Sequence, residues 1–140
     1  MDLDEAWSLS NEVWAKLGYD RGALPPTLKV VHLLGWLVYE LARGGTLGWL
    51  TRMGEYAPET AAALETIGAP RCASILREVA AVFPQGRPSA EDLEHILALI
   101  ADEAAAGRDP RDRGHSLSEG LEDVYALLQR FVAEHEADFT

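Results

Sequence analysis

The sequence predicts an all-α fold, a single domain of about seven helices that spans residues 1–140. Apolar residues recur every three or four positions through most of the chain, which is the period of an amphipathic helix. Prolines and paired small residues fall between these segments, where they end one helix and begin the next. No segment alternates apolar and polar residues between turn signals, so no strand is expected.

Four helices are expected in the first half of the chain, at residues 3–17, 26–43, 46–52 and 58–67. Pro25 and Pro26 begin the second of them, because proline suits the first turn of a helix. Its broad apolar face makes it the expected centre of the core. Gly44 and Gly45 separate it from the third helix, since glycine adopts positive φ at no steric cost.

Three more helices are expected in the second half, at residues 71–82, 90–106 and 119–138. Gly68 suits the end of the preceding helix, and Pro70 suits the first position of the next. Ser89 and Ser118 are the expected N-caps of the last two helices. Charges alternate around Pro110 between these helices, which is typical of a solvated loop.

The negative charge of the chain is concentrated in its last third. The formal net charge is −11 overall, made up of −3 over residues 1–24, +1 over residues 25–88 and −9 over residues 89–140. Nucleic acid and anionic membranes would be repelled, so basic proteins or cations are the expected partners.

A cytoplasmic location is expected from three further features. Cys72 is the single cysteine, so no internal disulfide can form. The N-terminus has neither the basic nor the apolar part of a signal peptide. The longest apolar-rich run, residues 30–42, is too short to cross a bilayer.

No motif for catalysis, for a metal or for a cofactor is present. Glu91 and His95 are four residues apart, as two ligands on one helix face would be, but no third or fourth ligand has a matching spacing. Cys72 lies in the expected first turn of a helix, which could lower the pKa of its thiol, but its apolar neighbours favour ordinary burial. We therefore expect a protein that is not an enzyme and holds no metal or cofactor.

Acidic residues of the last third are the candidate partner-binding residues. Some open a helix, where the helix dipole favours an anion, but others lie near helix C-termini, where the dipole disfavours one. Either solubility or a basic partner would account for the second group. The residues expected to form the binding surface are Asp102, Glu103, Glu119, Glu122, Asp123, Glu134, Glu136 and Asp138.

Several motifs are shared with one family over about residues 30–139. The central motif has Glu40, Gly44, Gly45 and Trp49, and it is followed by Ala63-Leu64, Ile67-Gly68-Ala69, Ala73, Ile75-Leu76 and Phe83-Pro84. The closing helix carries Leu121, Tyr125, Phe131-Val132, His135 and Phe139. In these residues the chain resembles the bacterial DNA mimic protein family.

The resemblance implies an all-helical fold, a homodimer and no catalysis. For the family's namesake it implies that carboxylates standing in for phosphates occupy the site of a DNA-binding protein. This chain departs from the family pattern at three places: Arg43 replaces the usual Asn, Gly48 replaces Gln, and Thr51-Arg52 replaces another Asn.

Three functional hypotheses follow. The first is a non-enzymatic protein that binds a basic, DNA-binding protein through its acidic C-terminal third. The second is an immunity or antitoxin-like protein that binds one cognate toxin through an apolar interface with an acidic rim. The third is a small-molecule sensor or enzyme that uses Trp36, Tyr39 and Trp49 as a pocket. Trp36 and Tyr39 belong to a mixed stripe of the second helix, with Lys29, His32, Glu40 and Arg43, which is either half-buried packing or a contact surface.

Overall fold

The computed structural model describes residues 1–88, 98, 100–107, 117 and 119–139, and it contains helices and no strand over these residues. The elements with described bounds are α1 (Leu3–Lys16), η1 (Arg21–Ala23), α2 (Pro26–Met53), η2 (Gly54–Tyr56), α3 (Ala57–Thr66), α4 (Pro70–Ala80), η3 (Pro84–Gly86), α7 (Leu121–Glu134) and η4 (Glu136–Phe139), where η denotes a 3-10 turn. The all-α class is confirmed.

Five α-helices have bounds within the described part of the chain, so the expected number of seven is too high there. The expected second and third helices form one element, α2, in which only Gly45 leaves the helical conformation (φ 65°, ψ −164°). The break was expected, but no loop follows it, because a single left-handed glycine is enough to redirect the chain. Most of the expected helix at 90–106 lies outside the described residues, although residues 100–105 are helical.

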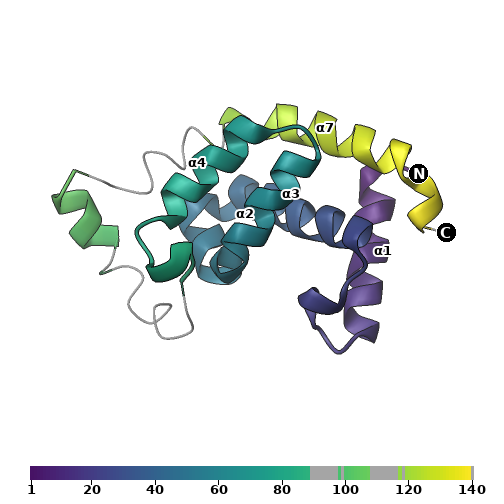
Figure 1. Ribbon diagram of the computed structural model, residues 1–140, viewed down its shortest axis with the longest axis horizontal. Helices are drawn as coiled ribbons and strands as arrows, with labels where there is room; N and C mark the ends of the chain where they lie inside the picture. Colours follow the sequence, from purple (N-terminus) through teal and green to yellow (C-terminus); the bar gives the residue numbers. More distant parts are fainter. Residues whose placement is uncertain (89–97, 99, 108–116, 118, 140) are drawn as a thin grey trace.

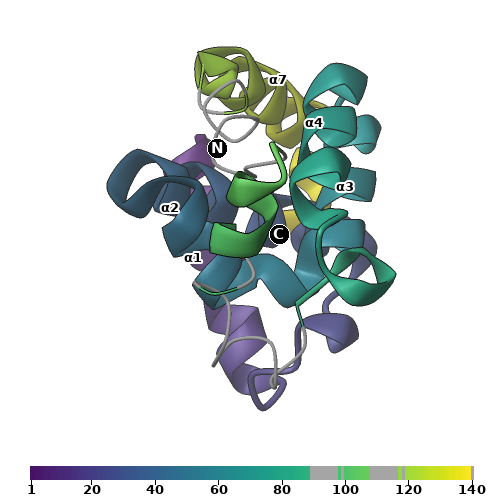
Figure 2. The same ribbon diagram turned by 90° about the vertical axis from the view of Figure 1, so that its left-hand side faces the viewer.

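The central element is α2, which contacts α1, α3 and α7 (Figures 1 and 2). In Figure 1, α7 runs along the top of the molecule and α1 stands across its C-terminal end. Residues of α2, α3, α4 and α7 meet in the core, where the largest fully buried side chains include Leu33, Leu37, Leu64, Leu76 and Leu128. Burying a leucine contributes about 1.5–3 kcal/mol, so this contact region dominates the stability of the fold.

The turn between α3 and α4 follows the expected chemistry. Gly68 adopts φ 89° just beyond the end of α3, and the amide of Ala69 donates to the carbonyl of Leu64 at 2.8 Å. Pro70 is the first residue of α4. These two predictions are confirmed, and they place α3 and α4 side by side (Figure 1).

The last helix is shorter than expected. Gly120 precedes it as N-cap, and α7 ends at Glu134, after which η4 completes the chain to Phe139. The proposed N-cap Ser118 lies outside the described residues. The expected continuous helix over 119–138 is therefore wrong at both ends, because Gly120 interrupts its start and a 3-10 turn replaces its last turn.

Among the described residues, no helix combines the length and apolarity that a membrane crossing requires.

Candidate partner-binding surface

The eight predicted binding residues do not form one continuous surface. Asp102 and Glu103 belong to the helical segment 100–105, at the end of the molecule opposite α1 in Figure 1. Glu119, Glu122 and Asp123 lie at the start of α7, whereas Glu134, Glu136 and Asp138 lie at its end and in η4. A helix of this length separates the two groups by roughly 20 Å. The exposed positions between them carry no acid: they are Tyr125, Ala126, Gln129, Arg130 and Ala133.

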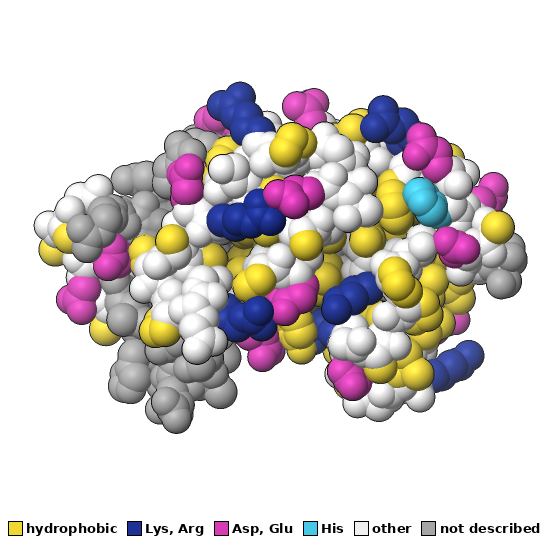
Figure 3. All heavy atoms as spheres, viewed as in Figure 1, with side chains coloured by type: hydrophobic (Ala, Val, Ile, Leu, Met, Phe, Trp, Pro, Cys, Tyr) yellow, Lys and Arg dark blue, Asp and Glu magenta, His cyan; other side chains and the backbone are white. Residues whose placement is uncertain are grey.

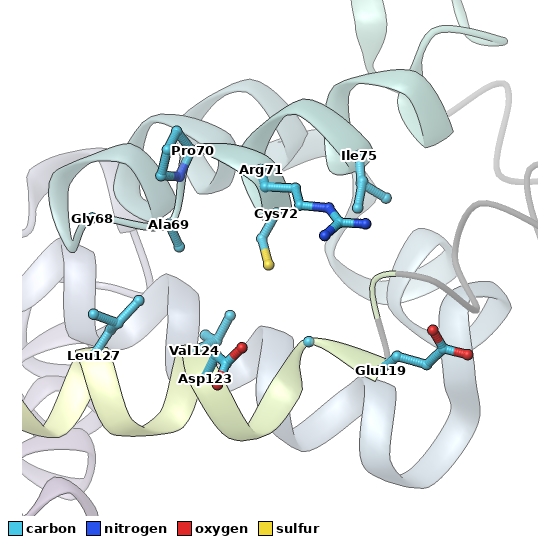
Figure 4. A pocket seen from close by; sticks show the side chains of 11 residues that line it. Gly68, Ala69, Pro70, Arg71, Cys72, Ile75, Glu119, Asp123, Val124 and Leu127 are labelled. Carbon is cyan, nitrogen blue, oxygen red and sulfur yellow. The ribbon is translucent and has the colours of Figure 1, made fainter.

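The acids at the start of α7 border a cavity of about 330 Å³ between α4 and α7. Figure 4 shows the Cys72 sulfur directed from α4 toward α7, where Asp123 and Val124 lie. Burial raises the pKa of the Cys72 thiol, and the Asp123 carboxylate raises it further. The thiol is therefore protonated and a poor nucleophile, as the expectation of ordinary burial requires.

Metal binding has no support in the part of the chain that the structure describes, where no three His, Cys, Asp or Glu side chains group as ligands would. The Glu91 and His95 pair lies outside the described residues.

Glu134 at the end of α7 lies 3.7 Å from Nε of Arg130, and the two acids of η4 also have partners within the chain. Glu136 lies 2.6 Å from the Met1 ammonium, and this contact lowers the pKa of the carboxyl and raises the pKa of the amine. Asp138 accepts a hydrogen bond from the Thr27 hydroxyl at 2.7 Å. Sequence reasoning gave the two acids of η4 no local role because their partners are more than a hundred residues away. Both carboxylates nevertheless remain exposed, so they still contribute to the surface charge.

A second set of acids, which the sequence analysis did not single out, lies beside them on α1. Asp4, Glu5 and Glu12 line a hollow of about 530 Å³ whose apolar part includes Leu9 and Phe139. The available signal was the i, i+4, i+8 spacing of Asp4, Ser8 and Glu12, which places them on one helix face. Phe139 brings η4 against this face. We call the acids of α1, the end of α7 and η4 the α1–η4 acidic surface: Asp4, Glu5, Glu12, Glu134, Glu136 and Asp138.

Two arginines on the face that carries α3 and α4 are paired with acids of α3. Arg77 lies 2.6 Å from Glu65, and Arg87 lies 3.1 Å from Glu59. Figure 3 shows basic and acidic side chains interspersed on the face that carries α3 and α4. Within the described residues, α1 contributes one basic side chain, Lys16, so its acids add net negative charge to the α1–η4 acidic surface. The Met1 ammonium and Arg130 offset part of this charge, because they pair with Glu136 and Glu134.

The family motif around Glu40 has a structural role. The Glu40 side chain is 3% exposed, and its Oε2 lies 2.7 Å from Nη1 of Arg52. This pair joins the two halves of α2 across the break at Gly45. A Cβ atom at Gly48 would lie 3.8 Å from the Glu40 carboxylate, an ordinary contact, so the pair does not require glycine there. One departure from the family pattern, Arg52, thus supplies the partner of a buried carboxylate.

The mixed stripe of α2 is divided between packing and exposure. His32 is fully buried, and its Nε2 accepts a hydrogen bond from Nε of Arg21 at 2.9 Å. The Arg21 guanidinium lies over the Trp14 ring, 4.2 Å from its centroid. Burial, reinforced by Arg21, lowers the pKa of His32 to about 4. Tyr39 in contrast is 38% exposed.

The aromatic pocket expected from Trp36, Tyr39 and Trp49 is not formed by these three residues. Trp49 is 1% exposed and belongs to the core. Trp7 of α1 takes its place beside Trp36 and Tyr39, with ring centroids 5.3 Å and 5.7 Å away respectively. Sequence reasoning missed Trp7 because the pairing of α1 with α2 is a tertiary contact.

Comparison with known proteins identifies one family. The family model described as DMP19-like protein matches residues 22–135. No curated protein and no solved structure matches the chain. The matched region contains α2, α3, α4 and α7, and it leaves α1 and η4 outside. The chain belongs to the DMP19-like protein family, the DNA mimic family that its motifs resemble.

Proposed function

We propose that this protein binds a basic, DNA-binding protein through carboxylates that imitate DNA phosphates, and that it has no catalytic activity. The observation that carries the proposal is the accumulation of exposed acids on a member of a DNA mimic family. The acids at the two ends of α7 and on α1 would present charge in clusters, each facing one group of phosphate-binding side chains.

The spacing within a cluster is compatible with this role. Side chains one helical turn apart lie roughly 5–6 Å from one another, close to the phosphate spacing along one DNA strand. Asp4 and Glu12 lie two turns apart on one face of α1, roughly 12 Å along the axis, which is about the separation of every second phosphate. Glu122 and Asp123 are adjacent in α7, so they add charge without reproducing the spacing of one turn. The Ala126 to Ala133 stretch between the α7 clusters would not imitate phosphates.

The first experiment is affinity capture from a host lysate with the tagged protein, eluted in steps of rising salt. DNA-binding proteins that leave at low to moderate salt support the proposal, because salt screens charge-based contacts. Duplex DNA added to the bound column should release the same proteins by competition. If the column retains no DNA-binding protein at low salt, the proposal is wrong.

Charge reversal then identifies which acids matter. Glu122→Lys combined with Asp123→Lys should weaken capture, because like charges would replace complementary ones. Glu55→Lys is a suitable control, since Glu55 is an exposed acid in η2, away from the proposed surfaces.

An immunity or antitoxin-like function is the second candidate. It is favoured by the exposed Tyr39 and Tyr125, which lie among acids as the centre of a dedicated interface would. One partner retained at high salt would favour this function over DNA mimicry.

A further inference from the structure

A small pocket opens between α1, α2 and α7, next to the acidic hollow beside Phe139, with which it shares Asp4. Its volume is about 170 Å³, and it is lined by Leu3, Asp4, Trp7, Gly35, Val38, Tyr39 and Tyr125. Two of the lining rings, Tyr39 and Tyr125, are among the few large hydrophobic side chains exposed in the described residues. The proposed function, charge imitation by carboxylates, leaves these aromatic residues without a role.

We propose that this pocket binds the guanidinium group of an arginine side chain from the partner, an inference that rests on the proposed function. Aromatic faces attract cations through their quadrupole, and a nearby carboxylate adds a charge-assisted hydrogen bond. The pocket offers both, because three aromatic rings line it and Asp4 supplies the carboxylate. Among the described residues no basic side chain lines the pocket or pairs with Asp4, so the negative charge is available.

The size of the pocket fits one planar cationic group. A cavity of about 150 Å³ holds a benzene molecule, so the observed volume accommodates a guanidinium with its adjoining methylene groups.

The position of Trp7 depends on Gly35. A Cβ atom at residue 35 would overlap Cδ1 and Nε1 of the Trp7 indole, so only glycine lets the ring lie against the backbone of α2. Trp7 in turn lies 5.7 Å from Tyr39, which keeps the two rings together at one wall of the pocket.

The chain itself shows that this aromatic cluster accepts a guanidinium. The Arg43 guanidinium lies 5.1 Å from the centroid of the Tyr39 ring. Arg43 is not among the residues that line the pocket, so the partner's arginine would occupy a different place.

The test uses two short peptides, one of alternating glycine and arginine and one in which citrulline replaces arginine. Citrulline has the same shape as arginine but no charge. Nuclear magnetic resonance of the nitrogen-15-labelled protein reports on the four tryptophan indole N–H groups separately, and Trp7→Phe identifies the Trp7 signal. We expect the arginine peptide to shift the Trp7 signal but not that of the buried Trp49, and the citrulline peptide to shift neither.

Three variants test the pocket directly. Asp4→Asn should weaken binding of the arginine peptide by about tenfold, and Tyr125→Ala by about three- to tenfold. Tyr125→Phe keeps the ring and should bind as the parent protein does. Glu55→Gln is the control, because it removes the charge of an exposed acid in η2 that belongs to neither the pocket nor the α1–η4 acidic surface.

Equal binding of the two peptides, or equal losses for Asp4→Asn and Glu55→Gln, would overturn the pocket assignment. If lysate capture still yields DNA-binding proteins in that case, the proposed function stands without the pocket. If the arginine peptide binds in the pocket but no DNA-binding protein is captured, the pocket stands and the proposed function fails.

Discussion

His32 is a buried neutral base, and its surroundings make it a source of pH sensitivity. Its Nε2 accepts from Arg21, so protonation would both remove that acceptor and place two cations in contact. The indole of Trp14 packs on the same imidazole, with ring centroids 5.0 Å apart, and Tyr56 lies on the other side of Arg21. The neutral form is therefore the one compatible with the fold.

We expect the free energy of unfolding to fall as the pH decreases from about 6.5 to about 4. Because the pKa of His32 is lowered to about 4 in the folded protein, the unfolded chain binds its proton first in this range. The loss attributable to His32 should be roughly 2–3 kcal/mol at pH 4.5. Urea unfolding at pH 4.5 and pH 7 measures it, and His32→Gln provides the comparison. Parallel pH dependences of the two proteins would contradict the assignment.

Gly35 is the second residue whose importance comes from a distant contact. Gly35→Ala should destabilise the protein by about 1–3 kcal/mol, because the added methyl group would displace the Trp7 ring. Urea unfolding gives the free energy, and tryptophan fluorescence reports the displacement. When Trp7→Ala is already present, adding Gly35→Ala should no longer lower the free energy of unfolding. If it persists, the methyl group is not acting through Trp7.

Within the single element α2, two adjacent glycines adopt different backbone conformations. Gly44 is helical, whereas Gly45 has φ 65°, and a Cβ atom would meet nothing within 4 Å at either position. Gly44→Ala should therefore stabilise the protein by up to about 1 kcal/mol. Gly45→Ala should destabilise it by about 1–2 kcal/mol, since an L-residue is strained at positive φ. Thermal unfolding of the two variants measures the difference, and changes of the same sign would show that the break is not where it is placed.

The pair between Glu40 and Arg52 gives a further prediction for α2. Arg52→Met keeps an apolar stem but leaves the buried carboxylate without its partner, at a cost of about 1–3 kcal/mol. The exposure of Arg52 makes the lower part of this range the expected value. Arg77→Met removes the exposed pair with Glu65 and should have a much smaller effect in the same urea titration. Equal losses of unfolding free energy in the two variants would mean that the burial of Glu40 does not make its ion pair more important for stability.

Helix boundaries set by local chemistry could be predicted, and those set by distant contacts could not. Gly68 and Pro70 determine the turn between α3 and α4 by their own backbone preferences, so sequence reasoning placed it correctly. The end of α7 was placed four residues too late, because the apolar pattern continues to Phe139 while the backbone tightens into η4. Phe139 is buried, but a 3-10 turn presents it and not the expected helix.

On the scale of the whole molecule, the charge is asymmetric in three dimensions as well as along the chain. Arg77 of α4 and Arg87, which follows η3, pair with Glu65 and Glu59 of α3, which leaves the surplus of acids at the other helices. Charge totals could predict a basic partner, but they could not predict that acids of α1 would join those of η4. That arrangement depends on α1 packing against α2 and α7, contacts that no local pattern specifies.

Binding to a basic partner should therefore depend strongly on ionic strength. We expect the affinity to fall by at least about tenfold between 50 mM and 500 mM salt, since the contacts lie at the surface and are screened. Titration at several salt concentrations measures this with any captured partner. An affinity that does not change would indicate an apolar interface and would contradict the charge-based mode.

Both α1 and η4 lie outside the region that the family model matches, and they pack against each other. This arrangement has a consequence for the choice of partner. Residues 22–135 carry a formal charge of −6, and the 26 flanking residues carry the remaining −5 of the total −11. Nearly half of the formal charge thus lies in flanking segments that the family model does not include. Two proteins with the same helical region but different flanking segments could select different partners. Exchanging the flanking segments between them would exchange that selectivity.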